Sequence, residues 1–245
     1  DAPDFDPDPR SQPTSCGASA ASAASVSYFV PSFKMPQSLK TSLGADQRLP
    51  WGMVASLDLS YVHGLNSLYI TDANLTGPVG RLSGEGGRVL YGAIAATSTK
   101  GAVPSVTPSV VSTSFGPVLR NANHSGDRTY LATAQVQKRF ANGLEFDAAY
   151  TYMNAKDYFS LRDAQSVSNY GFAPVDGSLA SRNLAISTYN IPNQVTISGT
   201  VNGPVGLLFS AIYLGRSGSP FTYIVNGDAN ADGVRLSLRE GKVKM

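Results

Sequence analysis

Several features that mark common protein classes are scarce or missing in this sequence. Charged residues make up 15% of the 245-residue chain, well below the roughly 25% of an average soluble domain. A single cysteine, Cys16, excludes an intramolecular disulfide framework. No apolar run reaches the roughly 18 residues of a transmembrane helix. A net charge of +2 without a basic cluster argues against nucleic-acid binding.

What the sequence does contain is a pair of long alternating segments at its centre. Apolar and polar side chains alternate along residues 128–140 and again along residues 144–157. Alternation at every second residue is typical of a β-strand, whose successive side chains point to opposite faces. Between the segments, Asn142-Gly143 supplies the positive φ of a tight turn. The sequence therefore predicts one long antiparallel hairpin.

The length of this hairpin indicates a membrane. Strands of soluble domains usually run about five or six residues, whereas a strand that crosses an outer membrane needs roughly 9–11. Tyr130 and Phe140 share the apolar face and are ten positions apart, which corresponds to about 25 Å along the membrane normal for a tilted strand. That is the height of the apolar band between the two aromatic girdles of a membrane barrel.

Two further hairpins repeat the pattern, over residues 36–63 and 194–213, with turns at 49–52 and 202–205. Trp51 and Tyr61 are again ten residues apart on an apolar face. The long intervals 64–126 and 158–190 show no sustained alternation, so we expect loops there. Because barrel turns are short on the periplasmic side and long on the extracellular side, these intervals should face outward. A mean hydropathy of −0.08 is compatible with this, since only alternate residues are apolar.

The expected fold is all-β: an antiparallel transmembrane β-barrel, present in part as about six long strands in three hairpins. Residues 1–25 are expected to be a disordered or loop segment, residues 26–233 the partial barrel, and residues 234–245 an atypical tail. Six strands do not close a barrel, and an open sheet edge is not tolerated in lipid. We therefore expect a piece of a larger barrel. The alternative is that Val26–Phe33 and Val234–Val243 add two strands and complete an eight-stranded barrel.

Ordered phrases between Phe33 and Gly233 resemble a known family. These are FKMPQSLKTSLGADQRLPWGMVASLDLSYVHGLNSLYITDANLTGPVG, YTYMNAKD, NIPNQVTISGTV and RSGSPFTYIVNGDANADG. They look like the barrel of Oar-like TonB-dependent outer-membrane receptors of Gram-negative bacteria. The resemblance implies a barrel of about 22 strands, filled by an N-terminal plug and energised through the TonB complex. It also implies three partners, namely outer-membrane lipid, the TonB complex (through the plug region of the full-length protein) and a transported solute.

Candidate binding residues follow from the polar strand faces, which would line the lumen. They are Lys40, Asp46, Asp58, Gln135, Gln137, Glu145, Asp147 and Thr196. Their carboxylates need no acid–base chemistry, because solvated lumen-lining side chains explain them. His63 and His124 lack partners at a catalytic spacing. We therefore expect no enzymatic activity and no cofactor other than a candidate calcium ion.

The candidate calcium loop is Asp228-Ala229-Asn230-Ala231-Asp232-Gly233, which has the D-x-N-x-D-G start of a calcium-binding loop. The twelfth position, where a bidentate glutamate belongs, is Arg239, and Glu240 misses it by one. An ion-free polar turn therefore stands as the competing interpretation, with Asp228, Asn230 and Asp232 as the metal ligands if calcium binds.

Two functional hypotheses remain open at this point. The first is solute binding and transport across the outer membrane by a TonB-dependent receptor. The second is a structural or adhesive outer-membrane β-protein, or a small complete eight-stranded barrel, without TonB-coupled transport. An upstream plug domain in the full-length gene would distinguish the receptor from the alternatives.

Overall fold

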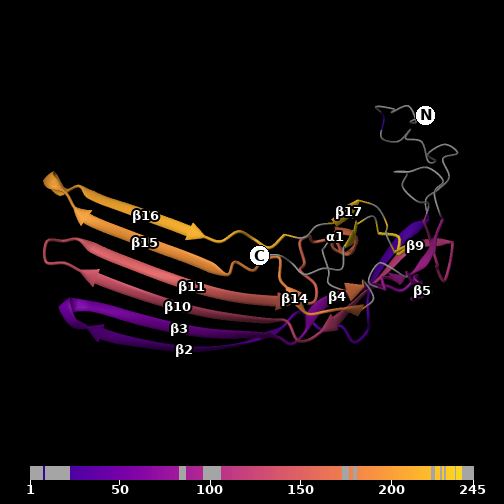
Figure 1. Ribbon diagram of the computed structural model, residues 1–245, viewed down its shortest axis with the longest axis horizontal. Helices are drawn as coiled ribbons and strands as arrows, with labels where there is room; N and C mark the ends of the chain where they lie inside the picture. The colour runs from indigo at the N-terminus through magenta and orange to yellow at the C-terminus, as the bar shows by residue number, and fades with distance from the viewer. Residues whose placement is uncertain are drawn as a thin grey trace.

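The computed structural model describes residues 8, 23–82, 87–95, 106–172, 177–178, 181–221, 224–226, 228, 230–234 and 236–238. Most of them lie in two regions: a long, curved antiparallel sheet and a compact group of shorter elements at one end of it (Figure 1). No helix in the described part of the chain is long and apolar enough to cross a membrane.

Six long strands form the wall of the main sheet, in the order β16-β15-β11-β10-β3-β2. Consecutive strands pair as the three predicted hairpins, which are thereby confirmed. Their bounds are β2 Ser38–Leu49, β3 Met53–Gly64, β10 Arg128–Arg139, β11 Glu145–Asp157, β15 Asn193–Asn202 and β16 Leu208–Arg216. The short β14 (Ala185–Ile186) pairs with the loop end of β11.

The strand register gives the main sheet one apolar and one polar face. Tyr130 lies opposite Tyr61, and Ala134 lies between Leu57 and Tyr150. Gln135, one residue further on, lies between Ser56 and Ala149 on the other face. Because alternation and register agree across the strands, the apolar residues form one continuous surface, here called the apolar face. The opposite surface is called the polar face.

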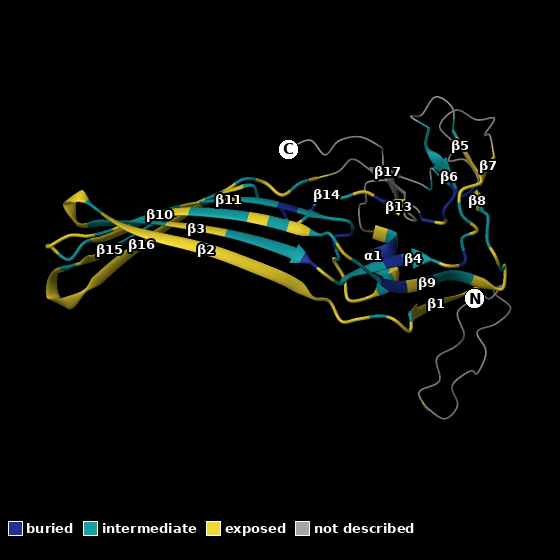
Figure 2. Ribbon diagram, turned by 90° about the horizontal axis from the view of Figure 1, so that it is seen from below, coloured by how far each residue is buried: buried dark blue, intermediate teal, exposed yellow. Residues whose placement is uncertain are grey.

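Side chains of the apolar face are accessible, as in a protein that meets lipid. Leu43 is 70% exposed and Phe209 56% exposed. Figure 2 shows the long strands as mainly intermediate or exposed, whereas the buried segments gather at the far end of the molecule. A soluble sheet would bury its apolar face against another layer. No described element covers this one.

Two of the hairpin turns share a Pro-X-Gly pattern with unusual backbone angles. They are the 3-10 turns η1 (Pro50–Gly52) and η2 (Pro204–Gly206). The central residues Trp51 and Val205 have φ of 62° and 54°, a region that side chains other than glycine rarely adopt. The third turn uses Gly143, with φ of 78°.

The interval 64–126 contains more order than predicted, which corrects the expectation of a loop. β9 (Phe115–His124) is the central strand of a second sheet, with β4 (Ser67–Asp72) antiparallel on one side. β1 (Ala24–Phe29) pairs with it in parallel on the other side. Likewise, the predicted loop 158–190 contains helix α1 (Ser166–Phe172). We call these elements and their connections the loop cap.

The loop cap holds the buried core of the described chain. Ile70, Leu119, Phe159, Tyr170 and Val234 pack together, each at most 8% exposed. The remaining described strands are short: β5 Gly80–Arg81, β6 Val89–Leu90, β7 Gly92–Ile94, β8 Val106–Pro108, β12 Gly177–Ser178, β13 Ser181–Arg182, β17 Ile224–Asn226 and β18 Leu236–Leu238. Val234 belongs to this core and is the first residue of segment 234–245, which was expected to be an atypical tail.

The eight-stranded alternative is not what the described residues form. β1, which covers most of Val26–Phe33, pairs with β9 in the loop cap. β18, within the C-terminal segment, pairs with β17. Neither joins the main sheet, so β2 and β16 are its edges in the described part of the chain. Of the segment 1–25, only residues 8 and 23–25 are described, and Ala24 and Ser25 belong to β1.

Candidate lumen-facing surface and loop cap

All of the predicted lumen-facing residues lie on the polar face of the main sheet. The register aligns Asp46, Gln135 and Thr196 in one row across β2, β3, β10, β11 and β15. Gln137 and Asp147 are direct partners in the next row toward the turns. Asp58 lies one row nearer the long loops than Gln135 does, and Lys40 lies nearer still. Glu145 lies at the turn end of the face.

Neighbouring strands are joined on this face by side-chain hydrogen bonds. Gln135 Nε2 donates to Asp147 Oδ2 at 2.5 Å, between β10 and β11. Ser56 Oγ donates to Asp46 Oδ1 at 2.5 Å, between β3 and β2. Thr133 and Thr151 pair through their hydroxyls at 3.0 Å. Such cross-strand pairs stabilise a sheet by a few tenths to about 1 kcal/mol each.

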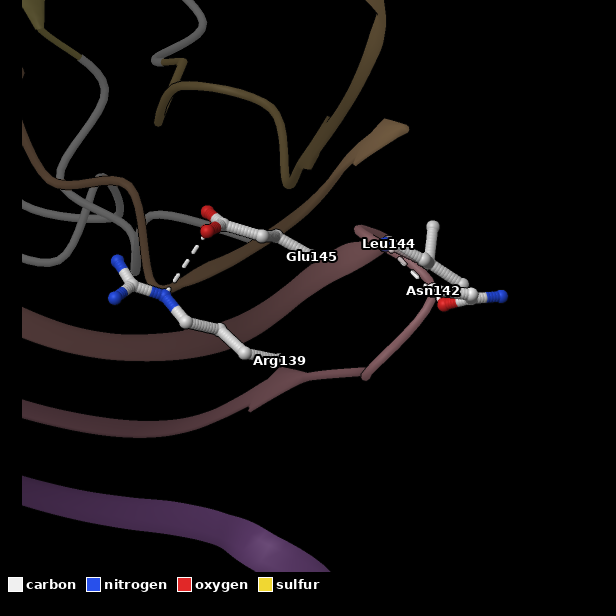
Figure 3. Close-up of polar contacts among 4 residues, drawn as sticks. All are labelled: Arg139, Asn142, Leu144 and Glu145. Carbon is white, nitrogen blue, oxygen red and sulfur yellow. Dashed lines mark hydrogen bonds and ion pairs between the residues drawn. The ribbon is translucent and has the colours of Figure 1, made fainter. Parts of the chain in front are cut away.

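At the turn end the polar face finishes in an exposed ion pair. Arg139 Nε lies 3.0 Å from Glu145 Oε1, with side chains 72% and 50% exposed (Figure 3). Solvent screening limits such a pair to about 0–1 kcal/mol. Asn142 Oδ1 accepts a hydrogen bond from the Leu144 backbone N–H at 3.3 Å, which helps to shape the turn (Figure 3). Glu145 therefore serves the hairpin rather than presenting a free carboxylate.

Other polar groups on this face remain available to a solute. The side chains of Lys40, Asp58 and Gln137 form no hydrogen bond or ion pair with any residue that the structure describes. Gly44 lies directly opposite Asp58, and a Cβ at that position would be 2.8 Å from Asp58 Oδ1. The glycine thus leaves room for the carboxylate.

A cavity of about 270 Å³ lies where the main sheet meets the loop cap. Its lining includes Ser38, Val62 and Thr129, which belong to the polar face, together with Ser67 at the start of β4 and Asp127 from the connection between β9 and β10. This places a small recess at the loop end of the same face that carries the free polar groups.

One end of the polar face departs from the pattern. On β16, Leu208, Ile212 and Leu214 take the positions that are polar on the other strands, and they are 63%, 76% and 56% exposed. This side of β16 is therefore mainly apolar, with Ser210 and Arg216 as its polar residues.

The candidate calcium loop has its carboxylates engaged by its own backbone. Asp228 Oδ2 accepts from the Gly233 N–H at 2.9 Å, and Asp232 Oδ1 accepts from the Val234 N–H at 2.8 Å. Asn230 Nδ2 donates to Asp232 Oδ2 at 2.9 Å. These bonds account for the shape of the turn without a cation, while Arg239 and Glu240 lie outside the described residues. Calcium binding stays a prediction.

Burial changes the acidity of this loop. Asp232 is 5% exposed, and desolvation raises its pKa to about 6, opposed by hydrogen bonds from Val234 and Asn230. Among the described residues, no group of three or more His, Cys, Asp or Glu side chains is arranged to hold a metal ion.

The two histidines have packing roles. His63 stacks on Tyr61 with ring centroids 6.3 Å apart, on the apolar face. His124 packs against Tyr69 and Tyr158, with centroid distances of 5.3 and 4.1 Å. Neither lies in a catalytic arrangement with a described residue, and Cys16 lies outside the described residues.

Arg182 is a central residue of the loop cap that the sequence did not indicate. It is 5% exposed, and its guanidinium lies 4.4 Å from the ring centroid of Tyr69 and 4.0 Å from that of Phe159. Its Nη2 donates to the Ile70 carbonyl, while Nε and Nη1 have no hydrogen-bond partner among the described residues. Desolvation lowers the pKa of Arg182 to about 10. No sequence signal marks this arginine, which lies in a polar stretch.

Buried asparagines tie the separate segments of the loop cap together. Asn121, on β9, donates from Nδ2 to Ser27 Oγ at 2.9 Å and accepts from Ser166 Oγ at 2.8 Å. It thereby connects β1 and α1. Asn74 donates from Nδ2 to the carbonyls of Phe115 and Gly116 at 3.0 Å. Amide side chains with four hydrogen-bonding positions suit such junctions.

An uncovered apolar face, aromatic residues near both ends of the strands and a polar opposite face define a membrane-spanning β-sheet protein. The chain matches the family of the outer membrane beta barrel domain over residues 2–243, and it belongs to that family. The all-β barrel fold and the outer-membrane location follow. No curated protein and no solved structure matches the chain.

Proposed function

We propose that this chain forms part of the barrel wall of a TonB-dependent receptor that binds a solute and transports it across the outer membrane. The observation that carries the proposal is a sheet of six long strands, polar on one face along β2, β3, β10, β11 and β15, with two unpaired edges within the described residues. Open edges are not tolerated in lipid, so further strands must pair with β2 and β16.

The apolar residues of β16 support a barrel filled by protein. Leu208, Ile212 and Leu214 point to the side on which the other strands are polar. Exposed apolar surface of this kind marks a contact with another protein segment. A plug domain inside the barrel is the occupant that a TonB-dependent receptor would supply, and its contact with the TonB complex would energise transport.

The polar face would act as a binding surface and not as a catalytic one. Lys40, Asp58 and Gln137 would offer both charges and an amide to a polar solute that passes the plug. The Oar-like phrases quoted above, which run from the first hairpin to the Asp228–Gly233 loop, support the same assignment by resemblance.

The loop cap is the observation that favours the second candidate, a structural or adhesive surface protein. It has a buried core of its own and lies on the side of the long connections, which face outward in barrels of this kind. A folded extracellular domain of this type would also serve attachment, without any coupling to TonB.

Binding of TonB separates the two candidates. The full-length protein, purified from outer membranes, is tested against the periplasmic domain of TonB by surface plasmon resonance, with a plug-deleted version as the control. We expect saturable binding that the deletion abolishes. Absence of binding, or a gene without a plug-encoding region, would contradict the receptor and leave the adhesive protein.

A further inference from the structure

Three basic side chains lie side by side at the loop end of the main sheet. In the strand register, His63 on β3 pairs with Arg128 on β10, and Arg128 pairs with Lys156 on β11. Adjacent strands are about 4.8 Å apart, so the three residues span roughly 10 Å. The flanking positions in the row are Leu39 and Ile186, which are apolar. We call His63, Arg128 and Lys156 the basic row.

The basic row is on the apolar face. His63 stacks on Tyr61, and the Tyr61 and Tyr130 rings pack with centroids 4.8 Å apart. Arg128 precedes Tyr130 by two residues on β10, and strand residues two positions apart share a face. The row therefore lies one step beyond the tyrosines, toward the long loops. Tyrosines at this position mark the level of the lipid headgroups.

The charges of Arg128 and Lys156 are not neutralised by any residue that the structure describes. Arg128 and Lys156 form no ion pair with any described residue. The adjacent carboxylates are directed to other partners: Asp127 Oδ1 accepts from the Tyr158 N–H at 3.0 Å, and Asp157 accepts from Ser160 Oγ at 2.7 and 2.8 Å. Basic side chains at the level of the headgroups attract anionic lipid groups.

We propose that the basic row binds the phosphate groups of a phosphorylated lipid in the outer leaflet. Arginine recognises phosphate through two parallel N–H donors, lysine adds a point charge, and the imidazole of His63 offers a further N–H. Leu39 and Ile186 beside the row suit the acyl chains. The inference rests on the membership of the outer-membrane barrel family and not on the proposed TonB coupling.

The opposite end of the same face provides a matched control. Lys138 also lies on the apolar face, four residues beyond Ala134 and eight beyond Tyr130 toward the turns, but its Nζ is 4.4 Å from the centroid of the Phe140 ring. It is a membrane-rim cation that already has an aromatic partner and faces the other leaflet.

The test measures lipid A binding by the full-length protein in a neutral detergent, using native mass spectrometry. The variants are the double substitution R128Q/K156Q and the control K138Q, and folding of each is checked by its heat-dependent gel mobility. We expect the double variant to bind lipid A roughly a hundredfold more weakly, since a hydrogen bond to a charged group contributes about tenfold. K138Q should bind as the unsubstituted protein does.

Further arms identify the ligand and keep the proposal falsifiable if the double variant does not fold. The unsubstituted protein is titrated with dephosphorylated lipid A and, separately, with inorganic phosphate as a competitor. We expect weak binding of the dephosphorylated lipid and no competition by millimolar phosphate. Equal binding of the two lipids, equal loss in K138Q, or displacement by free phosphate would overturn the assignment to a lipid headgroup.

Discussion

At the scale of single residues, buried polar side chains of the loop cap connect its segments through hydrogen bonds and ring contacts. Arg182 is held between two aromatic rings with one hydrogen bond to Ile70. Asn121 connects three elements. Such groups are costly when unpaired and specific when satisfied. They were not predictable, because a polar residue in a polar stretch carries no sign of burial.

Arg182 gives a prediction that separates the contribution of its packing to stability from the contribution of its charge. Arg182→Ala should destabilise the cap by about 2–4 kcal/mol, because it removes two ring contacts and leaves a cavity. Arg182→Met should cost much less, since it fills the space and removes a buried cation with two unpartnered nitrogens. Hydrogen exchange of the β4 and β9 amides measures both effects. Equal losses in the two variants would contradict this account.

Asp232 gives a prediction about pH. Its folded pKa of about 6 lies above the ordinary value of 3.8, so the folded cap binds a proton that the unfolded chain has released. This contribution to stability is complete below about pH 3.8 and is lost as pH rises through about 6. Thermal unfolding of the cap at pH 4.5 and at about pH 7, compared with Asp232→Asn, measures it. The unsubstituted protein should lose more stability than Asp232→Asn over that range, and parallel losses would refute the assignment.

At the scale of elements, the long hairpins were predictable and the cap was not. Strict alternation and turn dipeptides marked the hairpins, because one face of each strand meets an apolar medium throughout. β9 escaped prediction because its alternate positions include Asn121 and Asn123, whose side chains bond to neighbouring segments. β1 reaches β9 by a parallel pairing between residues about 90 positions apart, which no local pattern reveals.

The Pro-X-Gly turns give a prediction at this scale. Val205 has φ of 54° and is 93% exposed, so Val205→Gly should stabilise the third hairpin by about 0.5–1 kcal/mol through relief of backbone strain. Gly206→Ala, at φ of 77° with open space around its Cα, should destabilise it by a similar amount. Urea titration of the refolded protein compares them. A loss of stability in Val205→Gly would show that the strain argument is wrong.

At the scale of the whole molecule, the main sheet has one apolar and one polar face, and the loop cap lies at one end of it. The family membership places the sheet in the outer membrane. The polar face carries every lumen-facing candidate derived from the sequence, because register preserves strand alternation across the hairpins. What the sequence pattern missed at this scale is the apolar inner side of β16 and the basic row, which become visible only when the strands are aligned.

The most direct test of this arrangement compares two neighbouring residues in the middle of β10. Ala134 lies on the apolar face and Gln135 on the polar face. The full-length protein carrying Ala134→Lys or Gln135→Lys is refolded into lipid bilayers, and its free energy of unfolding is measured in guanidinium. We predict a loss of about 2–4 kcal/mol for Ala134→Lys and about 0–1 kcal/mol for Gln135→Lys. Equal losses, or the larger loss at Gln135, would contradict a barrel wall with its apolar face in lipid and its polar face in the lumen.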